Sequence, residues 1–151
     1  MNLRLRVVLD TNALISRLLV PNSVPALAVR RAITEYTVLA SDATIMELAD
    51  ALSRRKFDPY ATIEDRKAFL RLFGRIAEHV PILYVVRACR DPKDDKVLEL
   101  AVNGATDIII TGDADLLALS PFREIRIVGP ADFLRQDRVT GRPSDDPAGS
   151  Q

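Results

Sequence analysis

The chain has 151 residues, 48% of them hydrophobic and 28% charged, which is the composition of an ordinary globular domain with a sizeable core. Lysine plus arginine and aspartate plus glutamate number 21 each, so net charge gives no argument for a polyanionic partner. A single cysteine excludes an internal disulfide and, with a single histidine, argues against a zinc site. With one cysteine, a reducing cytoplasm is the expected location. We expect no signal peptide and no membrane span, because no apolar run is long enough for either.

Hydrophobic patterning predicts strands that alternate with helices along the chain. The expected strands are apolar runs rich in β-forming side chains, at residues 4–9, 37–40, 82–86, 107–111 and 125–128. The expected helices are residues 13–19, 25–35, 43–54, 62–78, 91–103, 114–119 and 130–134. This alternation predicts an α/β fold, with a parallel sheet of about five strands flanked by helices.

The end of the chain differs in composition from the rest. From Arg142 to Gln151 it contains no apolar residue larger than proline or alanine. Such a segment cannot bury enough apolar surface to offset the entropy of ordering it. We therefore expect one domain over residues 1–135 and a disordered or loosely attached tail over residues 136–151.

Four acidic residues lie where apolar segments end or helices begin. Asp10 and Asp113 each follow a predicted strand, and Glu47 and Asp95 each lie in the early turns of a predicted helix. Because open α/β sheets bind ligands outside the carboxyl ends of their strands, we expect these carboxylates to converge there. Converging carboxylates repel one another unless a cation neutralises them, so the sequence predicts an oxygen-ligated Mg²⁺ or Mn²⁺ site.

Each acid alone also has a structural explanation. Asp10 and Asp113 could cap the helices that follow them, because aspartate is a favoured N-cap residue. Glu47 could simply complement the dipole of its helix. Four such acids bordering one crevice are harder to explain as independent caps, and this convergence is the hypothesis that a structure can test.

The third acid is ambiguous between the neighbours Asp94 and Asp95. Asp91 followed by Pro92 is a good helix start, and Asp94, three residues after Asp91, can complete the cap. Asp95 then has no structural task, and its helical spacing from Leu98 directs it towards the protein. We therefore favour Asp95 over Asp94 as the ligand.

Together these motifs resemble the PIN domain. The matching segments are Val-Leu-Asp10-Thr11-Asn12, Glu47, Asp94-Asp95-Lys-Val-Leu-Glu-Leu-Ala and Ile-Ile-Thr111-Gly112-Asp113-Ala-Asp115-Leu-Leu. The resemblance runs from about residue 5 to residue 135, and is greatest to the VapC-like toxins of bacterial and archaeal toxin–antitoxin pairs. It implies a Rossmann-like, three-layer α/β/α domain and a ribonuclease that depends on Mg²⁺ or Mn²⁺.

The resemblance also implies roles for individual residues. The catalytic acids would be Asp10, Glu47, Asp95 and Asp113. Of these, the metal ligands would be Asp10, Asp95 and Asp113, and the supporting residues would be Asn12, Thr111 and Asp94. A metal-activated water would attack an RNA phosphodiester. An antitoxin protein and a second copy of the chain are the expected protein partners.

Other functions stay open at this point. A haloacid-dehalogenase-like phosphatase needs a second aspartate two residues after the first, where this chain has Asn12. A phospho-receiver domain needs paired acids and a late lysine that are not clear here, and glycine-rich nucleotide motifs are missing. The alternatives that stay open are an acid-cluster phosphatase and a non-catalytic PIN-fold module that binds RNA or a protein without turnover.

A basic triplet, Arg54, Arg55 and Lys56, follows the helix that carries Glu47. A solvated helix end is the default interpretation of such a charge run. Contact with the phosphate backbone of RNA is the functional alternative, because lysine and arginine supply most of the affinity of proteins for nucleic acids.

Overall fold

The computed structural model describes residues 4–136, which form a five-stranded sheet flanked by helices. The strands are β1 (Arg6–Leu9), β2 (Thr37–Ala40), β3 (Glu78–His79), β4 (Ile108–Ile110) and β5 (Arg126–Val128). The helices are α1 (Thr11–Leu19), α2 (Val24–Glu35), α3 (Asp42–Leu52), α4 (Ile63–Ile76), α5 (Pro92–Asn103), α6 (Ala114–Leu117) and α7 (Pro130–Arg135), with a 3₁₀ helix at Arg55–Phe57. Every strand pairing is parallel, so the prediction of an α/β fold with about five parallel strands is confirmed.

The strand order, β3-β2-β1-β4-β5, contains one reversal of winding direction. The chain first moves outward from β1 through β2 to β3, and α5 then carries it back to β4 on the other side of β1. The reversal therefore lies between β1 and β4, which is where open α/β sheets bind their ligands. Asp10 directly follows β1, and Asp113 lies three residues after β4.

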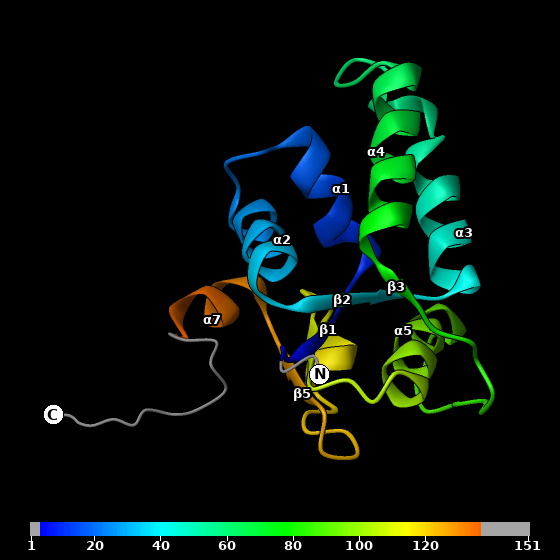
Figure 1. The fold of residues 1–151 in the computed structure, drawn as a ribbon, viewed down its shortest axis with the longest axis vertical. Helices are drawn as coiled ribbons and strands as arrows, with labels where there is room; N and C mark the ends of the chain where they lie inside the picture. Colours follow the sequence, from blue (N-terminus) through cyan, green and yellow to red (C-terminus); the bar gives the residue numbers. More distant parts are fainter. Residues whose placement is uncertain (1–3, 137–151) are drawn as a thin grey trace, which may run out of the picture.

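The strands alternate their side chains between two apolar cores. Val7 and Ile110 pack into the core that the sheet shares with α1, α2, α3, α4 and α7. Val8 and Ile109 face the opposite core, to which α5 and α6 contribute. Helices thus cover both faces of the sheet, as Figure 1 shows for α1–α4 on one side and α5 on the other. The predicted three-layer α/β/α arrangement is confirmed, and no helix within residues 4–136 is long and apolar enough to cross a membrane.

The prediction of a strand over residues 82–86 is wrong. The fifth strand is instead β3, Glu78–His79, which pairs with the end of β2. Two backbone N–H groups of the predicted strand are hydrogen-bonded to a side chain of α5 instead of to a neighbouring strand. Asn103 Oδ1 accepts hydrogen bonds from the N–H groups of Leu83 and Tyr84 at 2.8 and 2.9 Å. Apolar sequence alone could not reveal this competitor for the strand's hydrogen bonds.

The predicted tail over residues 136–151 lies outside the described residues, except for Gln136. The side chain of Gln136 accepts a hydrogen bond from Arg126 at 2.6 Å, and its carbonyl oxygen accepts one from Arg31 at 3.3 Å. The boundary between domain and tail stays a prediction.

Candidate metal centre

Helix capping places the two acids that follow β1 and β4. Asp10 is the N-cap of α1, and its Oδ1 accepts a hydrogen bond from the N–H of Ala13 at 2.8 Å. Asp113 is the N-cap of α6, and its Oδ2 accepts one from the N–H of Leu116 at 3.1 Å. Capping occupies one oxygen of each carboxylate and leaves the other for a different partner. The structural and functional interpretations of these acids are therefore compatible.

Thr111 links the two caps across the point where the winding reverses. Its fully buried hydroxyl donates a hydrogen bond to Asp10 Oδ2 at 2.6 Å and accepts one from the N–H of Asp113 at 3.0 Å. Asp10, Asn12, Gly112 and Asp113 line one pocket of about 380 Å³ beside it. The structure thus brings Asp10, Asn12, Thr111 and Asp113 together, while their roles in a reaction stay predictions.

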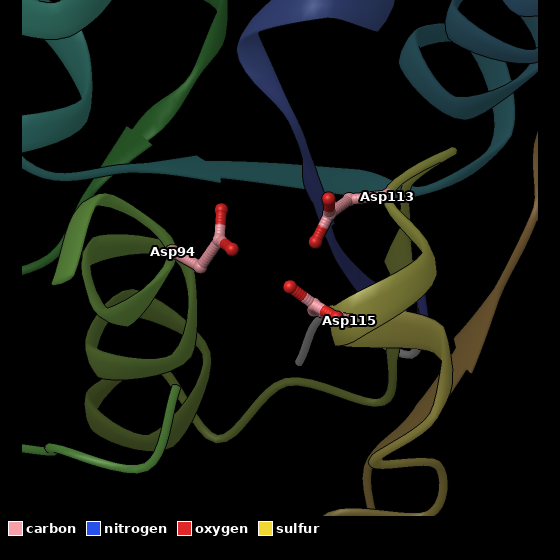
Figure 2. A group of neighbouring side chains, drawn as sticks. All are labelled: Asp94, Asp113 and Asp115. Carbon is pink, nitrogen blue, oxygen red and sulfur yellow. The ribbon is translucent and has the colours of Figure 1, made fainter. Parts of the chain in front are cut away.

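Three carboxylates lie close together at this edge of the sheet. One oxygen each from Asp94, Asp113 and Asp115 lies within 4.8 Å of the other two, and we call these residues the acid group. Figure 2 shows Asp94 reaching from α5, and Asp113 and Asp115 from the start of α6, with their carboxylates turned towards one another. Three oxygen ligands at this spacing fit a hard divalent cation such as Mg²⁺ or Mn²⁺.

The proton affinity of Asp94 reflects this crowding. Burial, and after it the nearby charges of Asp113 and Asp91, together raise the pKa of Asp94 to about 6. Like charges disfavour ionisation, and a bound cation reverses that effect. The electrostatics of the acid group therefore favour cation binding.

Asp115 was not among the predicted site residues. The sequence feature that could have identified Asp115 is its spacing from Asp113. The two aspartates flank Ala114 at the start of the helix that follows β4. Two acids in the first turn of a helix are easily explained by the helix dipole, which hides the signal. Only the position of Asp94 on another helix shows that Asp115 belongs to a group.

Asp95, the predicted third ligand, has a different task. Its Oδ1 accepts hydrogen bonds from the N–H groups of Ala88 and Cys89 at 2.9 and 2.8 Å. Burial opposes ionisation of Asp95, but these bonds outweigh it and hold the pKa of the carboxyl below its ordinary value. The expectation that Asp95 has no structural task is wrong, and with it the reason for preferring Asp95 to Asp94. Burial and the hydrogen bond to Asp95 raise the pKa of the Cys89 thiol to about 12, so it stays protonated.

None of the contacts described above involves Glu47 or the basic triplet. Glu47 is partly buried on α3, and among the described residues it is not a member of the acid group. Arg54, Arg55 and Lys56 are exposed at the outer end of the hairpin that α3 forms with α4 (Figure 1). Arg54 is paired with Asp50 at 3.6 Å. The functions of Glu47 and of the triplet stay predictions.

A family model described as PIN domain matches residues 6–115. The chain belongs to the PIN domain family. This PIN domain is 31% identical over 122 residues to the uncharacterized protein MJ1680 of Methanocaldococcus jannaschii, a match that covers 78% of this chain and 76% of that protein. PIN domains are in general metal-dependent nucleases, which agrees with the acid group found here.

Two solved structures have a similar fold. VapBC2 from Rickettsia felis, bound to a DNA fragment from their promoter, matches with a TM-score of 0.58 and 11% identity, over 83% of this chain and 98% of that chain. PAE2754 from Pyrobaculum aerophilum matches with a TM-score of 0.56 and 17% identity, over 87% and 88% of the two chains. At these identities the likeness concerns the PIN fold alone.

Proposed function

We propose that this PIN domain is a Mg²⁺- or Mn²⁺-dependent endoribonuclease that acts as the toxin of a toxin–antitoxin pair. The observation that carries the proposal is the acid group formed by Asp94, Asp113 and Asp115. It lies at the edge of the sheet where the winding reverses, and Asp113 shares a pocket with Asp10. Phosphodiester hydrolysis by metal-activated water needs such a set of oxygen ligands and no side-chain nucleophile.

In this proposal the third acid is Asp94 rather than Asp95. Asp94 and Asp113 would hold the cation together with Asp115, and Asp10 would face it across the shared pocket. Bound there, a divalent cation would lower the pKa of a water ligand and stabilise charge on the phosphate. Thr111 keeps Asp10 in place through its 2.6 Å hydrogen bond.

Two further residues have supporting tasks in this scheme. Asn12 is exposed and lines the pocket next to Asp10, where its amide could orient substrate or water. Glu47 on α3 could orient a water from the opposite side, as the resemblance to other PIN domains implies. Both assignments are tested by substitution with alanine, which should reduce the cleavage rate without unfolding the protein.

The bonding of Asp10 disfavours the phosphatase alternative. An aspartate that attacks phosphorus directly needs a carboxylate oxygen free to approach the substrate. Here Oδ1 of Asp10 accepts from the N–H of Ala13, and Oδ2 accepts from the hydroxyl of Thr111. A carboxylate held at both oxygens suits a positioning or metal-facing group better than a nucleophile.

An antitoxin partner is supported by an apolar groove between α1, α2 and α4. The groove has a volume of about 460 Å³ and includes Leu72 and Ile76, whose side chains are exposed. Arg17 and Arg30 also line it, which suits a partner segment with apolar side chains flanked by carboxylates. The similar structure from Rickettsia felis is described as VapBC2, and we propose that this chain likewise pairs with an antitoxin. A homodimer is also proposed, and sedimentation of the purified protein would test it.

The proposed activity is tested with purified protein, single-stranded RNA and Mn²⁺. We expect cleavage that EDTA stops and that Asp10→Asn or Asp94→Asn lowers about 100-fold or more. The matched control is Asp132→Asn, which removes a carboxylate whose side chain is 61% exposed on α7 and should leave the rate unchanged. RNA binding without Mn²⁺-dependent cleavage would instead identify a non-catalytic module.

A further inference from the structure

Arg90 lies against the acid group, and the proposed reaction does not yet use it. Its Nη2 donates a hydrogen bond to Asp115 Oδ1 at 3.1 Å. Asp115 in turn lies within 4.8 Å of Asp94 and Asp113 through one carboxylate oxygen each. The guanidinium of Arg90 therefore lies beside the acid group, whose crowded carboxylates favour binding of a positive charge.

The backbone on both sides of Arg90 is held by hydrogen bonds, whereas its side chain is largely exposed. Before it, the N–H groups of Ala88 and Cys89 are held by Asp95. After it, Asp91 caps α5 by accepting a hydrogen bond from the N–H of Lys93 at 2.9 Å. The side chain of Arg90 itself is 83% exposed. A fixed backbone and an exposed, charged side chain suit a group that contacts a substrate.

The contact between Arg90 and Asp115 is also easily exchanged. An exposed ion pair of this kind contributes little to stability. A divalent cation held by Asp115 would repel the guanidinium at this short range and replace it. Arg90 would then lie next to the cation with its donors free, and a guanidinium fork matches the oxygens of a phosphate group.

We propose that Arg90 is a substrate-positioning residue: it pairs with Asp115 in the metal-free protein and, with a divalent cation bound, donates hydrogen bonds to a phosphate of the RNA. This proposal rests on the ribonuclease function proposed above. It predicts effects of opposite sign on two ligands. Removing the guanidinium removes a competitor for the cation, but it also removes a contact with the phosphate.

The test is Arg90→Gln, compared with the wild-type protein. Calorimetric titration with Mn²⁺ alone should show binding about three- to tenfold tighter, because no guanidinium competes for Asp115. Cleavage of single-stranded RNA at saturating Mn²⁺ should show KM raised about tenfold, with a smaller change in kcat. Arg90→Lys, which keeps the charge but not the fork, should give values between the two.

The matched control is Arg71→Gln, which removes an exposed arginine on α4 and should change neither Mn²⁺ affinity nor KM. A wild-type KM for Arg90→Gln overturns the proposal, whatever the Mn²⁺ affinity of the variant. Unchanged Mn²⁺ affinity also overturns it, because the ion pair would then not compete with the cation. Failure of the wild-type protein to cleave RNA with Mn²⁺ refutes the ribonuclease function instead, so the two failures are distinguishable.

Discussion

Thr111 and Asp10, which are 101 positions apart in the sequence, are joined by a hydrogen bond of 2.6 Å from the threonine hydroxyl to the aspartate Oδ2. The same hydroxyl accepts the N–H of Asp113, so it ties the end of β1 to the start of α6. Because Thr111 is fully buried, water cannot replace either bond. One hydroxyl thus links the two acids that follow β1 and β4.

Thr111→Val should lower the free energy of unfolding by about 1–3 kcal/mol, because it leaves a carboxylate oxygen and an N–H group without their partner. The cleavage rate should fall as well, since Asp10 loses its anchor. Urea denaturation measures the first effect. Thr106→Val is the matched control: Thr106 Oγ1 is buried without a hydrogen-bond partner, so its loss should be neutral or stabilising. Equal stability losses in the two variants would contradict the assignment.

The raised pKa of Asp94 predicts a pH dependence of definite sign. The pKa is about 6 in the folded protein against an ordinary value of 3.8, so the folded chain binds more protons between these values. The metal-free protein should therefore lose stability as the pH rises from about 4 to about 6, relative to an Asp94→Asn variant that lacks this titration. Thermal denaturation midpoints in EDTA at successive pH values measure the difference. Parallel pH profiles for the two proteins would contradict the raised pKa of Asp94.

The layers of the fold were predictable because local signals agree with the tertiary structure. The run Ile108–Ile110 is apolar on both faces, as a strand between two helical layers must be. Asp91-Pro92 and Asn103-Gly104 mark the two ends of α5 for reasons of backbone chemistry alone. The prediction of a strand at residues 82–86 failed because the hydrogen-bond acceptors for this backbone are side chains of α5. No local sequence pattern encodes that contact.

The acid group was only partly predictable, for a similar reason. One step along a helix turns a side chain by about 100°. Which of Asp94 and Asp95 faces the acids of α6 therefore depends on how α5 is rotated, and on the N–H groups that Ala88 and Cys89 present to it. Neither the rotation of α5 nor the position of these N–H groups can be predicted from the spacing of the acids in residues 91–95. The convergence of acids from two separate segments could be predicted, because strand order and the position of strand ends follow from the fold class.

The basic triplet should matter only for long substrates. Arg54, Arg55 and Lys56 lie at the outer end of the α3–α4 hairpin (Figure 1), so RNA must extend from the acid group to reach them. Replacing all three with glutamine should weaken binding of a long single strand, and should flatten the plot of log affinity against log salt by about 0.7 per lost phosphate contact. Fluorescence anisotropy at several salt concentrations measures both effects. A short oligonucleotide is the control, and it should bind the variant and the wild-type protein equally.

Long RNA that binds the triplet variant as it binds the wild-type protein would leave these residues as a solvated helix end. That outcome is physically reasonable, because Arg54 already has a partner in Asp50 and the ammonium of Lys56 lies 5.2 Å from the ring centre of Phe57. The test therefore decides between two roles that the structure allows.

The same substitution should have a large effect on activity at Asp94 and little effect at Asp95. Asp94→Asn removes a charge from the acid group, so Mn²⁺ binding and cleavage should fall by about 100-fold or more while the metal-free protein becomes more stable. Asp95→Asn keeps an oxygen that can accept from Ala88 and Cys89, so activity should stay within about threefold of wild type. Asp95→Ala loses both bonds and should lower the free energy of unfolding by about 1–3 kcal/mol.

Two measurements separate these effects. Calorimetry with Mn²⁺ measures the affinity of the site for the cation, and urea denaturation measures the free energy of unfolding. Asp95→Ala should also raise KM, since the turn that anchors Arg90 loses its attachment to α5. Restoring the acceptor with Asp95→Asn should return KM to the wild-type value. A metal ligand would behave differently, because the neutral amide lacks the negative charge that attracts the cation. Loss of Mn²⁺ binding in Asp95→Asn, with normal binding in Asp94→Asn, would make Asp95 the ligand and contradict the hydrogen-bonding role assigned to it here.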